Sequence, residues 1–104
     1  MKYNKLVRDK IPDVLKEKGE TPVTHTATDE EYWKKLKEKL KEEVAEFVSR
    51  EDVEYLADIL EIINAICEFK KFDPEMVEKL RKEKIKSKGG FSGKIILDEI
   101  KINV

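Results

Sequence analysis

Residues 51–69 read EDVEYLADILEIINAICEF, and this stretch decides the fold class. It contains six acidic residues and neither Lys nor Arg, although Lys and Arg occupy 22 of the 104 positions in the chain. Apolar residues recur every three or four positions, as in a helix with a broad buried face. We therefore expect residues 52–69 to form the central helix of a bundle. The predicted inner face consists of Val53, Leu56, Ile59, Leu60, Ile63, Ile66 and Cys67, widened by Tyr55, Ile62 and Phe69.

Three acids of this helix, Glu54, Asp58 and Glu61, are spaced so that they share one helical face. Like charges on one face repel one another, and the segment has no basic residue of its own to neutralise them. This face therefore favours an external cation or a covering element.

A second helix is expected over residues 29–48, where Thr28 and Glu31 have the spacing of a capping box. At about 100° per residue, Glu43 points into the middle of its apolar stripe and Glu46 toward the edge, whereas Glu42 lies nearer to solvent. An unpaired buried carboxylate is costly, so Glu43 needs a partner. The predicted stripe consists of Trp33, Leu36, Leu40, Val44 and Phe47.

The short connection at residues 49–52 is typical of two antiparallel neighbouring helices. The two acidic groups would then face each other and supply the oxygen ligands that Mg²⁺ prefers. Such a site can neutralise a triphosphate, orient water for attack on phosphorus and stabilise departing pyrophosphate without a Ser, Cys or His nucleophile. The competing interpretation is that these acids, Glu42, Glu46 and Glu54 above all, cover solvated helix faces.

The remaining pattern predicts two further helices and a tail. One helix is expected over residues 8–18, and another begins with Asp73 as N-cap and Pro74 and ends near residues 86–88. Gly89 and Gly90 break the pattern before the β-branched tail KIILDEIKINV, expected to be extended or a strand. The predicted fold is all-α: one domain over residues 1–104, a compact bundle of about four helices with a short extended C-terminal tail.

Composition limits the classes of partner. Apolar residues make up 39% of the chain and charged residues 43%, so the core is small and oligomerisation would help to complete it. A net charge of −1 argues against nucleic-acid binding. The single cysteine, Cys67, excludes an intrachain disulfide and is expected to be a buried thiol. Without a signal-like or membrane-spanning apolar run, we expect a cytoplasmic protein with no membrane partner.

The chain resembles the MazG-like all-α nucleoside triphosphate pyrophosphohydrolases. Their EExxE motif is matched by Glu42, Glu43 and Glu46, and the second acidic helix is matched by YLADILEII at residues 55–63. The segments KLVRDKIP (5–12), DEEYWKKLKEKLKEE (29–43) and GGF (89–91) are similar to the small house-cleaning branch of this superfamily. The resemblance covers nearly the whole chain.

The resemblance implies Mg²⁺-dependent hydrolysis of a nucleoside triphosphate to a monophosphate and pyrophosphate, with Mn²⁺ able to substitute. Carried over, Glu43, Glu46 and Asp58 become catalytic metal ligands and Glu61 a candidate fourth. One departure is that the second family motif is ExxD, whereas Tyr55 stands three residues before Asp58. Either Glu54 shifts into that role or Glu61 replaces it, and Glu42 is a further acidic candidate.

Substrate contacts outside the metal site are also expected. Lys5 and Arg8, in the basic cluster before the first helix, are candidates for binding phosphate. Trp33 could wall a base pocket, although aromatic residues at helical spacing are more often core. Asn64 could read a base or satisfy a hydrogen bond in the core.

Three functions compete at this stage. The first is house-cleaning hydrolysis of noncanonical nucleoside triphosphates by a homodimer or larger homo-oligomer. The second, with the same chemistry, is the phosphoribosyl-ATP pyrophosphohydrolase reaction of histidine biosynthesis, because that related family has similar acidic helices. The third is a noncatalytic helical interaction protein that binds a basic partner, in which case the carboxylates would be spread over an exposed surface.

Overall fold

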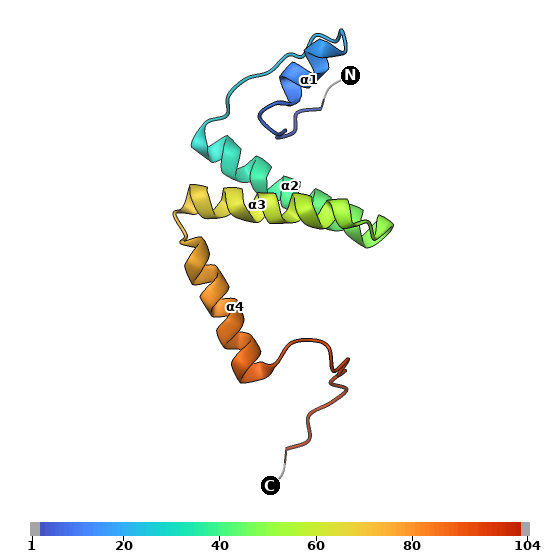
Figure 1. The fold of residues 1–104 in the computed structure, drawn as a ribbon, viewed down its shortest axis with the longest axis vertical. Helices are drawn as coiled ribbons and strands as arrows, with labels where there is room; N and C mark the ends of the chain where they lie inside the picture. The colour runs from blue at the N-terminus through green and yellow to red at the C-terminus, as the bar shows by residue number, and fades with distance from the viewer. Residues whose placement is uncertain (1–2, 103–104) are drawn as a thin grey trace. The chain divides into compact units, whose positions relative to one another are not determined.

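The computed structural model describes residues 3–102 and shows an all-α protein, as predicted (Figure 1). Within the described residues there are four helices and no strand. The chain divides into two compact units, Met1–Lys71 and Phe72–Val104, and the single domain expected from the sequence stays a prediction. The helices are α1 (Ile11–Glu17), α2 (Asp29–Arg50), α3 (Val53–Lys70) and α4 (Pro74–Lys88).

Helices α2 and α3 form a hairpin and lie side by side along their length (Figure 1). The connection is only two residues long, and its first residue, Glu51, has left-handed backbone angles (φ 53°). Its second residue, Asp52, caps α3 by accepting a hydrogen bond from the Glu54 amide at 3.1 Å. At the other end of the hairpin, the Thr28 hydroxyl accepts a hydrogen bond from the Glu31 amide, which confirms that predicted cap.

Packing between α2 and α3 buries few side chains completely. Leu36, Ile62 and Cys67 are the apolar residues with less than a tenth of their surface exposed among those described, and Leu36 is only 1% exposed. The face of α3 that packs is rotated from the predicted one, because this helix is apolar on most sides and only one side meets α2. The predicted inner-face residues that are instead exposed are Val53, Leu56, Leu60 and Ile63.

Helix α1 is shorter than the predicted span of residues 8–18. The chain first makes a turn in which the Ile11 amide donates to the Arg8 carbonyl at 3.0 Å, and Pro12 occupies the first helical turn, where its missing amide hydrogen costs nothing. Gly19 (φ 84°) lies just after the helix end, where its positive φ costs little.

The second unit contains α4 and the tail. Asp73 caps α4 by accepting from the Glu75 amide at 2.9 Å, and the helix ends at Lys88 before Gly89 (φ 85°), both as predicted. The tail has neither helix nor strand as far as residue 102. Within residues 3–102, no helix combines the length and the apolar character needed to cross a membrane.

Candidate functional site

The candidate site lies on the α2–α3 hairpin, where Glu43 of α2 faces Asp58 of α3. Glu43 is buried, with 7% of its surface exposed, although it is charged. Its Oε1 atom lies 3.6 Å from the Lys39 ammonium nitrogen, whereas its Oε2 atom is buried and has no hydrogen-bond partner. We call Glu43 and Asp58 the carboxylate pair. The burial of Glu43 confirms the prediction that it points into the apolar stripe.

The electrostatics of Glu43 reflect this confinement. Burial raises the pKa of its carboxyl group above the ordinary value, the nearby Lys39 lowers it, and repulsion from Asp58 raises it again. Ionised carboxylates only accept hydrogen bonds, so Asp58 and Glu43 can form a hydrogen bond only when one of the two is protonated. The pair therefore needs either a shared proton or a shared cation.

Three basic side chains surround the acids and are called the cation set: Lys5, Arg8 and Lys39. The Arg8 guanidinium donates a hydrogen bond to Asp58 Oδ1 at 2.8 Å. The Lys5 ammonium lies 3.2 Å from Glu42 Oε1, and the Lys39 ammonium lies 4.0 Å from the same atom. These contacts bring the segment before α1 against the hairpin and place Lys5 and Arg8 beside the acids.

A further contact holds this N-terminal segment. The Lys35 ammonium group on α2 donates to the backbone carbonyl of Asn4 at 2.8 Å. Asn4 itself has a positive φ of 47°, which turns the chain where Lys35 reaches it. The segment therefore has polar contacts to both helices of the hairpin.

Lys39 is a site residue that the sequence analysis missed. A signal for it was present, because Lys39 precedes Glu42 by three residues and Glu43 by four, and such residues are neighbours on a helix. Helical spacing thus predicts the contact. The partly buried setting of Lys39, with 28% of its side chain exposed, follows only from the packing of the hairpin.

The other predicted acids have separate surroundings. Glu46 is paired with Arg50 at 3.1 Å, one helical turn later. Glu61 is exposed and accepts a hydrogen bond from the Asn64 amide at 3.2 Å, and Glu54 is exposed in the first turn of α3. Throughout residues 3–102, no group of three or more His, Cys, Asp or Glu side chains is gathered in a way that could hold a metal ion.

The predicted base-pocket residues lie away from the carboxylate pair along the helices. Trp33 stacks on Phe69, with ring centroids 5.6 Å apart and an interplanar angle of 12°. It precedes Glu43 by ten positions, which is about 15 Å along a helix. Asn64 binds the carboxylates of Glu61 and, at 3.4 Å, Glu68. Their role in binding a base stays a prediction.

The carboxylate pair fits a hard divalent cation in its donor chemistry. Glu43 offers a buried oxygen with no partner, and Asp58 offers a second carboxylate from the facing helix. Protein sites for Mg²⁺ usually supply one or two carboxylates, while water and substrate phosphates supply the other oxygens. Two facing carboxylates therefore meet the requirement without a third.

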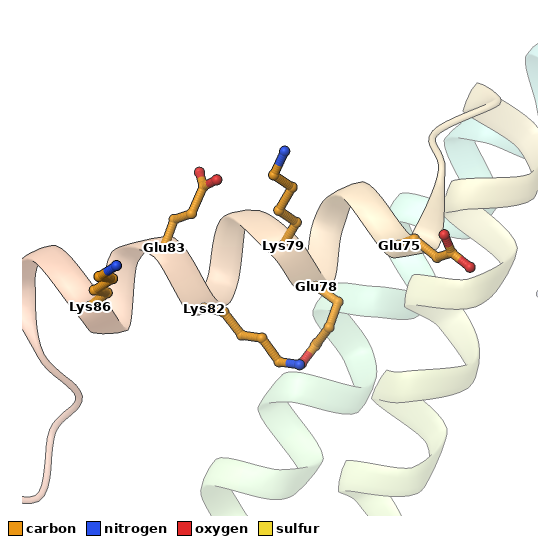
Figure 2. A pocket seen from close by; sticks show the side chains of 6 residues that line it. All are labelled: Glu75, Glu78, Lys79, Lys82, Glu83 and Lys86. Carbon is orange, nitrogen blue, oxygen red and sulfur yellow. The ribbon is translucent and has the colours of Figure 1, made fainter.

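The second unit offers a different kind of surface. A shallow hollow runs along α4, lined by charged side chains of that helix alone (Figure 2). It contains none of the predicted site residues, and its lining includes side chains of both charges. The lining residues are Glu75, Glu78, Lys79, Lys82, Glu83 and Lys86.

The raised pKa of Glu43 predicts a pH-dependent cost to stability. The folded chain binds the proton of the Glu43 carboxyl group more tightly than the unfolded chain does. This protonation therefore stabilises the fold fully below about pH 4.5, and the stabilisation is lost as the pH rises through the raised pKa. Glu43→Gln stays neutral at every pH. Its unfolding free energy in urea, without metal, is expected to exceed the wild-type value increasingly across that window and by a constant amount above it.

The exposed acid Glu38, on the same helix, provides the matched control. Glu38→Gln removes the same charge at a side chain that is 51% exposed, so we expect no comparable gain with rising pH. An advantage of Glu43→Gln that shrank as the pH rose would contradict the assignment of a raised pKa.

Comparison with known proteins adds one partial match. No protein-family model and no solved structure matches the chain. A protein of Mycolicibacterium smegmatis, described as uncharacterized, is 56% identical over 41 residues, which make up 39% of this chain and 42% of that relative. The match thus spans less than half the length of the relative, and the description of that relative names no activity.

Proposed function

We propose that the chain is a Mg²⁺-dependent nucleoside triphosphate pyrophosphohydrolase that releases a nucleoside monophosphate and pyrophosphate. The observation that carries the proposal is the carboxylate pair, in which Glu43 is buried beside Asp58 and keeps an oxygen without a partner. Burying such a group costs stability unless a ligand uses it. A cation shared by the two carboxylates would remove that cost.

Each residue of the site has a role in this proposal. Glu43 and Asp58 hold the metal, and Glu46 and Glu61 are the further candidates from the adjacent turns. When bound, Mg²⁺ would neutralise phosphate charge and lower the pKa of a water, which makes that water easier to deprotonate for attack on phosphorus. Arg8 binds phosphate oxygens through its forked guanidinium and stabilises charge on the departing pyrophosphate.

Lys5 acts with Arg8 on the phosphates. Both belong to the N-terminal segment and already lie beside the acids, with roughly half of each side chain exposed. Their position supports a triphosphate entering from the solvent side of the hairpin. The biological role proposed is the removal of noncanonical nucleotides in the cytoplasm.

The alternative substrate is phosphoribosyl-ATP, which needs the same metal chemistry. The noncatalytic alternative, binding of a basic partner, has some support in the exposed and separate positions of Glu54 and Glu61. It leaves the buried, unpartnered oxygen of Glu43 without a role. We therefore favour the enzyme.

Assembly into a homodimer or larger homo-oligomer is part of the proposal. Helix α3 carries an apolar stripe that α2 does not cover, and the hairpin has few fully buried apolar side chains of its own. If a second copy packed its stripe against this one, both apolar stripes would be buried. The stripe consists of Val53, Leu56, Leu60 and Ile63.

The direct test is pyrophosphate release from ordinary and modified nucleoside triphosphates and from phosphoribosyl-ATP, with Mg²⁺ and with chelator. We expect release that requires the metal and shows a clear preference within the panel. The best substrate would separate the house-cleaning role from the phosphoribosyl-ATP reaction. An absence of metal-dependent release from every compound would favour the interaction protein.

A further inference from the structure

We infer that the carboxylate pair takes up divalent metal and triphosphate cooperatively, because the cation set occupies the acids until phosphate draws it away. The inference rests on the proposed function and adds a property that the function does not require. It assigns two successive partners to Arg8 and Lys39: carboxylates in the empty site, and phosphate oxygens in the loaded one.

The first support is the balance of charge. Three carboxylates, those of Glu42, Glu43 and Asp58, lie among three cationic side chains, Lys5, Arg8 and Lys39. A divalent cation entering alone brings two positive charges into a group that is already neutral. It must push the basic side chains away, which weakens its binding.

The second support is the geometry of the Arg8 contact. At 2.8 Å from Asp58 Oδ1, the guanidinium makes a charge-assisted hydrogen bond with a carboxylate that the metal also needs. Lys39 similarly lies 3.6 Å from Oε1 of Glu43. Both metal-binding carboxylates therefore have a competing cation.

The third support is the oxygen that the cation set leaves free. Glu43 Oε2 has no partner, and nine-tenths of the Glu43 side chain is buried, so the existing ion pairs do not satisfy the site. A proton shared with Asp58 or a bound cation is still needed there, beyond what the basic residues supply. The cluster is neutral in charge, yet this oxygen still has no hydrogen-bond donor.

A triphosphate relieves the competition. It carries several negative charges at neutral pH and offers many acceptor oxygens. Lys5 and Arg8 have 52% and 58% of their side chains exposed, so they can turn toward a ligand on the solvent side. As the basic side chains move to phosphate, the carboxylates become available to the metal. Each ligand therefore increases the affinity for the other, as coupled binding requires.

The test measures binding directly and does not depend on turnover. The full chain is titrated with Mn²⁺ alone, with free ion followed by electron paramagnetic resonance. A nonhydrolysable α,β-methylene triphosphate is then titrated by calorimetry, with and without Mn²⁺. Wild type is expected to bind Mn²⁺ weakly alone, and Mn²⁺ is expected to increase analogue affinity by a factor of roughly 5 to 150.

Lys39→Gln is the decisive variant and Lys41→Gln the matched control. Lys41 is an exposed lysine two residues further along α2, and its replacement removes the same charge from the helix. We expect Lys39→Gln to bind Mn²⁺ alone several-fold more tightly than both wild type and Lys41→Gln. The increase in analogue affinity caused by Mn²⁺ is expected to shrink in Lys39→Gln.

The outcomes separate this inference from the proposed function. If all three proteins bind Mn²⁺ alone equally well, the metal site stands and the competition is refuted. If none binds Mn²⁺, with or without the analogue, the proposed metal site itself fails. Circular dichroism of each variant verifies that the helices are retained.

Discussion

Asp58→Asn is expected to lower metal-dependent pyrophosphate release about a thousandfold while the helices remain folded. The substitution keeps the volume of the side chain and removes its charge, so one of the two proposed metal ligands is lost. A metal ion contributes several kcal/mol of transition-state stabilisation in phosphoryl chemistry, and about 4 kcal/mol corresponds to this factor. Initial rates with the best substrate, at saturating Mg²⁺, measure the effect.

Arg8 also loses its ion pair in this variant, because the amide oxygen that replaces the carboxylate can accept the same hydrogen bond but carries no full charge. Glu43→Gln is expected to reduce the rate similarly, yet to stabilise the metal-free fold above the raised pKa. Asp13→Asn, on α1, is the matched control and is expected to keep wild-type activity. Full activity of Asp58→Asn and Glu43→Gln would eliminate the proposed site.

Leu36→Ala is expected to destabilise the fold by about 2–5 kcal/mol, the usual cost of deleting a fully buried leucine side chain. Leu36 is 1% exposed on α2, so the deletion leaves a cavity that the neighbours can fill only partly. Urea unfolding followed by circular dichroism at 222 nm gives the difference in unfolding free energy, with Mg²⁺ absent.

Leu60→Ala makes the same chemical change at a residue that is 67% exposed in the single chain. In a monomer it is expected to cost less than about 0.5 kcal/mol. If a second copy covers α3, the cost becomes larger and depends on protein concentration, because association contributes to stability. Equal losses for Leu36→Ala and Leu60→Ala at the lowest measurable concentration would contradict the packing described for α2 and α3.

The sequence predicted the helices well because their ends carry strong local signals. Thr28, Asp52 and Asp73 each accept a hydrogen bond from an amide in the first turn of the next helix. Pro74 follows the last of these caps, and Gly89 comes directly after that helix. Such signals depend on residues a few positions apart, so they can be recognised without knowledge of the tertiary structure.

Local sequence signals could not predict which face of α3 packs against α2. Apolar side chains occupy most of its circumference, so the periodicity of the helix does not distinguish Ile62, which is buried, from Leu60, which is exposed. The choice depends on how the side chains of α2 fit against α3. Local spacing contains no information about that fit.

In the candidate site, too, local features could be predicted from the sequence and long-range contacts could not. The burial of Glu43 followed from its position in an apolar stripe, and the ion pair between Glu46 and Arg50 follows from four-residue spacing. The contact between Arg8 and Asp58 joins residues 50 positions apart, so it depends on the folded arrangement. Both residues were predicted from the sequence as site residues, but their contact with each other could not be predicted.

The attachment of the N-terminal segment makes the candidate site sensitive to ionic strength. Lys5 and Arg8 reach the hairpin through exposed ion pairs, whereas α2 and α3 are joined by apolar packing. Added salt shortens the Debye length from about 10 Å at 0.1 M to about 3 Å at 1 M and weakens only the first kind of contact. Concentrated salt would thus loosen the segment from an intact hairpin, and the choice of assay buffer would determine how much of the cation set stays beside the acids.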